Sequence, residues 1–189
     1  MQWQIDSSHS SITAAARHMM LTTVRGAFSG TSGVIDFDPA KPEAGSIELR
    51  IPAASVNTGD EKRDGHLRSA DFLDAATHPE IVFKSTKVTP KGKDEFVVDG
   101  NLTIRGTTKP VSVNVELLGI QPDPRSGQRA AFDAKFSFDR TQWGLVWNMP
   151  IPSGVLVGEK ITVEASVAAT PKTEAVEAET DSASEAAVA

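Results

Sequence analysis

One charged segment contains most of the residues whose types and spacing could do chemistry. It spans residues 58–79 and includes Arg63, Asp64, Arg68 and Asp71. Arg63 can pair with Asp64, and Arg68 with Asp71, at the short spacings that a helical turn brings together. This pattern favours a solvated charge network that ties the segment to the rest of the fold. The alternative is a polar mouth that receives a pyrophosphate or carboxylate, which suits the donor fork of arginine.

The four histidines are the second group of candidates: His9, His18, His66 and His78. No pair has the spacing of a zinc motif, so the sequence predicts neither a metal site nor a cofactor. His9 and His78 fit turns. His18 falls on the apolar face of an expected strand over residues 12–18. It is either a buried, hydrogen-bonded imidazole or a polar contact for the head group of a ligand.

The sequence shows no pattern typical of an enzyme. It lacks cysteine and therefore has no thiolate nucleophile, and Gly-x-Ser-x-Gly is absent. Gly26, Gly30 and Gly33 do not form a nucleotide-binding loop, and they fit bulges or bends within strands. We therefore predict no catalytic residues. An enzyme on lipid-like substrates would require a polar pair inside the fold, such as His18 with an acid.

The charge distribution excludes a nucleic-acid partner. The formal net charge is −6, and residues 170–189 carry −4 of it because they hold five acids and one base. The remaining residues are nearly balanced, with no clustered basic excess. No apolar run approaches the length of about 18 residues that a membrane helix needs, so we expect no stable membrane insertion. With no leader visible, we expect a cytoplasmic protein, or a periplasmic one if a leader has been removed.

Most of the chain alternates apolar and polar residues, which is typical of strands. Residues 111–117 show the pattern best, and residues 12–18, 47–51, 96–98, 102–104, 132–138 and 161–167 repeat it. Asp99-Gly100 indicates a tight turn or a bulge. About eight strands at hairpin spacing predict an all-β sandwich or an up-and-down barrel.

The charged segment interrupts this alternation, and we expect a short helical insert at about residues 58–76. Thr58 with Glu61 fits a capping box, and Ser69 fits a second helix start. Residues 170–189 are rich in Ala, Glu, Ser and Thr without an aromatic residue. That composition predicts a disordered tail.

The aromatic residues of the expected barrel fit two alternatives. They either pack against one another in a filled core or line a tunnel for an apolar ligand, and composition does not separate the two. The residues are Phe28, Phe83, Phe96, Phe132, Phe136, Phe138, Trp143 and Trp147.

Six sequence blocks, in order, resemble the YceI-like family of polyisoprenoid-binding proteins. Residues 63–74 (RDGHLRSADFLD) are the most specific block, and the resemblance extends over about residues 2–168. The other blocks are residues 3–10, 17–20 with 24–28, 79–86, 100–106 with 108–111, and 138–144. The chain departs from the family pattern at Ala14 and Ala16, where bulkier apolar residues are usual.

The resemblance implies an eight-stranded antiparallel, lipocalin-like barrel over residues 1–169, crossed by the insert and followed by the tail. It further implies an apolar tunnel that binds a long-chain isoprenoid or fatty-acyl lipid, as carrier, storage protein or sensor and without catalysis. The alternative is an interaction or stress-response module with a self-filled barrel, and homodimerisation stays open. The expected ligand-binding residues are His18, Phe28, Leu67, Phe72, Leu73, Phe83, Phe136 and Trp143.

Overall fold

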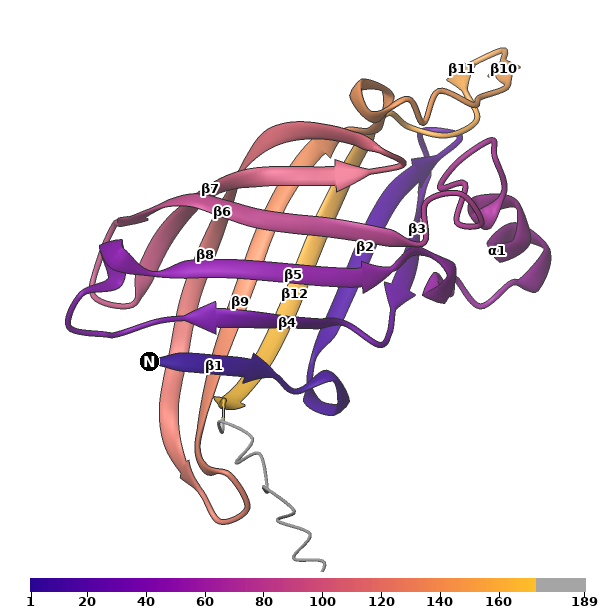
Figure 1. Ribbon diagram of the computed structural model, residues 1–189. Coiled ribbons are helices and arrows are strands. Elements are labelled where there is room, and N and C mark those ends of the chain that lie inside the picture. Colours follow the sequence, from indigo (N-terminus) through magenta and orange to yellow (C-terminus); the bar gives the residue numbers. More distant parts are fainter. Residues whose placement is uncertain (173–189) are drawn as a thin grey trace, which may run out of the picture.

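A closed antiparallel β-barrel forms the body of the protein in the computed structural model, which describes residues 1–172 (Figure 1). Ten strands share one sheet in the order β1-β4-β5-β6-β7-β8-β9-β12-β2-β3, and β1 also pairs with β12. The strands are β1 (Gln2–Ile5), β2 (Ser11–His18), β3 (Thr22–Phe28), β4 (Ser32–Asp36), β5 (Ser46–Pro52), β6 (Glu80–Pro90), β7 (Glu95–Ile104), β8 (Thr107–Asp123), β9 (Gly127–Asp139) and β12 (Lys160–Pro171).

The ten strands form an eight-stranded barrel, because β1 with β2, and β3 with β4, each make up one interrupted strand of it. The 3-10 turn η1 (Ser7–His9) separates β1 from β2, and a bend separates β3 from β4. One edge of β12 therefore pairs first with β2 and then, from Ala169 onward, with β1. The predicted all-β barrel with eight antiparallel strands is confirmed. A small hairpin, β10 (Pro150–Ile151) with β11 (Gly154–Val155), stands outside the barrel.

The helical insert lies between β5 and β6 and is shorter than predicted. Its only α-helix among the described residues is α1 (Glu61–Arg68), which Asp60 caps by accepting from the Arg63 N–H. The predicted Thr58 cap is wrong, because Thr58 instead donates its N–H and hydroxyl to Asp64. The predicted second helix is also wrong, because Ser69 ends α1 and hydrogen-bonded turns follow.

The remaining short elements are 3-10 turns at the ends of strands. They are η2 (Pro42–Ala44), η3 (Ala53–Ser55) and η4 (Arg140–Trp143). The Asp99-Gly100 pair lies within β7, opposite a bulge of β6 between Ser85 and Lys87, and makes no turn. A Cβ at Gly100 would stand 2.5 Å from the Phe83 ring, so glycine lets that ring lie across the strand.

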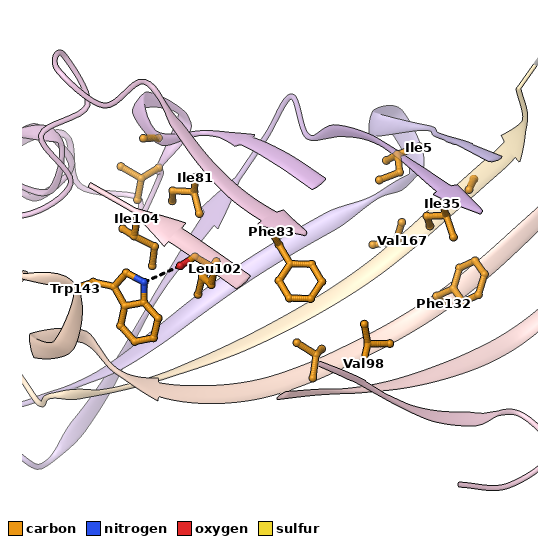
Figure 2. Packing of buried hydrophobic residues seen from close by; sticks show 14 of the residues in the cluster. Ile5, Ile35, Ile81, Phe83, Val98, Leu102, Ile104, Phe132, Trp143 and Val167 are labelled. Atoms are coloured by element: carbon orange, nitrogen blue, oxygen red, sulfur yellow. Dashed lines mark hydrogen bonds between the residues drawn. The ribbon is translucent and has the colours of Figure 1, made fainter. Parts of the chain in front are cut away.

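The inward-facing side chains of the barrel are more deeply buried toward one end. Along β12, the inward-facing Val167 and Ala169 are buried, whereas Ile161 and Val163 on the same face are only half-buried. Figure 2 shows buried residues of the core, including Val167, and the Trp143 indole that donates to the Leu102 carbonyl at 2.9 Å. Inward-facing side chains that remain half-exposed require an internal space.

The end of the barrel lies two residues beyond the predicted domain boundary at residue 169. Thr170 and Pro171 belong to β12, where they pair with Gln4 and Trp3. Apart from these two residues and Lys172, the predicted tail lies outside the described residues.

Candidate ligand cavity

An apolar cavity of ≈ 790 Å³ occupies the hollow part of the barrel. Side chains from the barrel strands and from the insert line it. Seven of the eight predicted ligand-binding residues are among them: His18, Phe28, Leu67, Phe72, Leu73, Phe83 and Phe136. The insert therefore presents its apolar side chains inward, as its Leu and Phe positions predicted.

Trp143 is the predicted site residue that does not line the cavity. Its ring is buried behind Leu102 and is held there by the hydrogen bond to the Leu102 carbonyl. Trp147 lines the cavity in its place, with ring centroids 4.6 Å from His66 and 5.4 Å from Phe72. Sequence reasoning did not single out Trp147, because residues 140–154 follow no strand or helix period.

Small residues widen the cavity along β2 and β3. Ala14 and Ala16 both face inward, and Ala14 is paired with Gly26 of β3. A Cβ at Gly26 would lie 3.1 Å from the Thr58 methyl and 3.5 Å from Val56, so the insert packs directly on the backbone of β3. The departures from the family pattern at positions 14 and 16 thus fall on the wall of the cavity.

One group of polar residues on the cavity wall lies where β2 and β3 approach the insert, and a second, Asp36 with Ser46, lies at the paired ends of β4 and β5. In the first group, Arg17, Asp60, Lys62 and Arg63 are exposed and also line the cavity, so its mouth opens here. His18 and His66 lie on the wall at the same end. The lining residues at this mouth include three cations and one acid, and the exposed Glu61 lies between Asp60 and Lys62 in the chain.

The predicted arginine–aspartate pairs of the insert do not form. Arg63 donates to the Thr58 hydroxyl at 2.7 Å and to the Thr58 carbonyl at 3.0 Å. Asp71 instead accepts from His66 at 2.9 Å. The prediction was wrong because the α1 helix ends at Arg68, so that the turn after it carries Asp71 toward His66.

Asp64 is a buried carboxylate with a structural role. Only 4% of it is exposed, and it accepts from both the N–H and the hydroxyl of Thr58. These bonds stabilise the carboxylate, and the Thr58 hydroxyl is the main reason that the Asp64 pKa lies below its ordinary value. Asp64 therefore fastens α1 to the loop that packs on β3.

Arg140 is a buried cation that holds together the chain segments at this end of the barrel. Its guanidinium donates to the carbonyls of Gly158 at 3.0 Å, Trp147 at 3.1 Å and Val157 at 3.2 Å, and to that of Leu145. Burial lowers the Arg140 pKa. Arg140 is also among the residues that line the cavity.

The apolar wall suits binding, and of the two histidines on it, His66 is paired with Asp71 at 2.9 Å. Within residues 1–172, the His18 ring makes no hydrogen bond or ion pair with an acidic side chain. No three His, Asp or Glu side chains of these residues are placed to hold a metal ion. In this part of the chain, no helix is long and apolar enough to span a membrane.

The closed barrel and its apolar cavity place the protein in the lipocalin-like class of β-barrels. The YceI-like domain family matches residues 3–169, and the chain therefore belongs to this family. A UPF0312 protein of Shewanella baltica is 36% identical over 140 residues, which cover 74% of this chain and 73% of that protein.

Two solved structures extend the comparison. BcnA of Burkholderia cenocepacia superposes with a TM-score of 0.76 at 26% identity, covering 88% of this chain and 99% of BcnA. A polyisoprenoid binding domain from Saccharophagus degradans superposes with a TM-score of 0.67 at 17% identity, covering 90% of this chain and 98% of that domain. The second similarity shows a shared fold.

Proposed function

We propose that the protein binds a long-chain polyisoprenoid or a similar lipid in its cavity, as a carrier, store or sensor and without catalysis. The predominantly apolar cavity of ≈ 790 Å³ is the observation that carries this proposal. Pockets of about 300–1,000 Å³ are typical of small-ligand sites. The relation to a polyisoprenoid binding domain supports the same ligand class.

The shape of the cavity favours a ligand that is apolar along most of its length. Each buried CH2 group contributes about 0.8 kcal/mol, so a long chain can bind tightly with few polar contacts. The alternative of a self-filled barrel requires packed side chains where the structure has the cavity. The cavity therefore supports the carrier over an interaction module.

Native mass spectrometry with a defined probe tests this function. The purified protein is first delipidated in detergent, exchanged into buffer and then offered geranylgeraniol, a neutral isoprenoid alcohol. We expect one bound molecule per chain and a rise in melting temperature, because ligand binding stabilises the folded state. Absence of both co-purified lipid and isoprenoid uptake would contradict the proposal.

A further inference from the structure

An exposed apolar cluster lies at the end of the barrel where the cavity opens. Seven large apolar side chains are exposed in the part of the chain that the structure describes, and five of them are at this end. We term these five the apolar tip: Met19, Met20, Leu21, Val146 and Met149. Exposed clusters of this kind mark interaction surfaces, whereas single exposed apolar residues are ordinary.

The five residues form one surface because their segments are hydrogen-bonded together. The Leu156 carbonyl accepts from the Met19 N–H at 2.7 Å, and the Leu156 N–H donates to the Met149 carbonyl at 2.9 Å. Arg140 donates hydrogen bonds to the carbonyls of Leu145 and Trp147, on either side of Val146, and to that of Val157. It thereby holds these two segments together. In Figure 1, the β2–β3 turn lies beside the loop that carries β10 and β11.

The turn that carries Met19 and Met20 has a backbone conformation that is unfavourable for methionine. Met19 and Met20 have φ angles of 52° and 60°, in the left-handed region. Tight hairpin turns of this kind favour Asn, Asp or Gly, and other side chains are strained there. The turn nevertheless places methionine at both positions, followed by Leu21 with 74% of its surface exposed. Methionine is flexible and adapts to irregular apolar surroundings.

Cations surround the tip on the side of the cavity mouth. The Arg17 guanidinium donates to the Leu21 carbonyl at 2.9 Å, so it is fixed next to the tip. Lys62 and Arg63 also line the mouth, next to the exposed acids Asp60 and Glu61. With Arg17 there are thus three cations and two acids here, whereas the whole chain has a net charge of −6. Apolar residues flanked by cations are the combination that binds the interface of an anionic bilayer.

We propose that the apolar tip docks the barrel onto the surface of a bilayer that contains anionic lipids, with the cavity mouth facing the membrane. The apolar side chains enter the head-group region, and Arg17, Lys62 and Arg63 face the phosphates. A second copy of the chain is the weaker occupant, because a symmetric dimer through this surface would bring like charges together. Docking goes beyond the proposed function, although its purpose, exchange of lipid between bilayer and cavity, rests on that function.

Flotation with vesicles of equal parts phosphatidylcholine and phosphatidylglycerol tests the docking. The test variant is Met20→Asn/Leu21→Ser, in which Asn suits the left-handed backbone at position 20, so that the fold is retained. The matched control is Leu118→Ser, which removes a comparably exposed apolar residue from β8. We expect the wild type and the control to float with the vesicles, and the test variant to bind roughly tenfold more weakly or worse.

Several outcomes would overturn the docking proposal. These are no co-flotation of the wild type, equal loss in both variants, or a concentration-dependent dimer that only the test variant abolishes. Uptake of geranylgeraniol from ethanol solution, without vesicles, is measured in parallel. The test variant should retain this uptake, so failure of docking and failure of lipid binding give different results.

Discussion

The small wall residues of the cavity allow a quantitative test of where the ligand lies. Ala14→Leu adds three carbon atoms beyond the Cβ, at a position that faces the hollow part of the barrel beside Gly26. The added atoms displace about three CH2 groups of a bound chain. At about 0.8 kcal/mol per CH2 group, the loss is about 2.4 kcal/mol, or about 50-fold in Kd.

Isothermal titration with a series of isoprenoid alcohols of increasing length measures this loss. Because the new side chain enters empty space, Ala14→Leu should leave the melting temperature of the free protein unchanged or raise it. Ala27→Leu is the matched control, because Ala27 is exposed and lies outside the cavity wall. We expect this control to bind every alcohol as the wild type does.

The chain-length dependence separates the cavity from a surface site. Short alcohols that do not reach Ala14 should bind Ala14→Leu normally, whereas the longest ones should show the full loss. Equal affinity of wild type and Ala14→Leu for all lengths, with both proteins folded, would refute our placement of the ligand.

Three further predictions concern stability. Gly100→Ala should lower the free energy of unfolding by about 1–3 kcal/mol, because the alanine Cβ would enter the space of the Phe83 ring. Urea denaturation measures this loss, and an unchanged midpoint would contradict the packing. Arg140→Lys keeps the positive charge but loses the guanidinium that donates to four carbonyls. We expect the free energy of unfolding to fall by about 1–3 kcal/mol in the same assay. Wild-type stability of this variant would show that those hydrogen bonds are dispensable. The Asp64 pKa is depressed below 3.8, so the carboxylate stabilises the fold above that pH, and this contribution disappears as the pH falls through the folded-state pKa. Asp64→Asn should therefore have a lower melting temperature than the wild type at pH 7 and a weaker decline of melting temperature below pH 4. Parallel curves of melting temperature against pH for the two proteins would refute the assignment.

The fold was predictable from sequence to the extent that local patterns determine it. Alternation along residues 111–117 and 132–138 identified strands with one apolar face, and the count of such strands indicated a barrel. The interruption at residues 58–76 located the insert, and its Leu67, Phe72 and Leu73 do line the cavity. Neither pattern could establish that the interior is hollow, because filled and hollow barrels use the same residues.

The errors arise where contacts distant in sequence determine the geometry. For Asp99-Gly100, of the two predicted alternatives, the turn is wrong and a bulge is present in the opposite strand; the glycine is required by the Phe83 ring on that strand. Trp143 and Trp147 are equivalent by sequence alone. The hydrogen bond to Leu102 buries the first behind the barrel wall, and the second reaches the cavity beside His66.

The contact between β3 and the loop that precedes α1, which we term the seam, affects which ligands can enter the cavity. Among the described residues, this seam consists of two backbone hydrogen bonds between Ala27 and Asn57 and one from the Ser29 N–H to Ser55. The other neighbouring strands of the barrel are joined by ladders of three or more residue pairs. Parting the seam thus costs a few hydrogen bonds, each worth about 1 kcal/mol, and leaves the rest of the barrel closed. A molecule too wide for the mouth therefore meets the smallest hydrogen-bond cost at this seam.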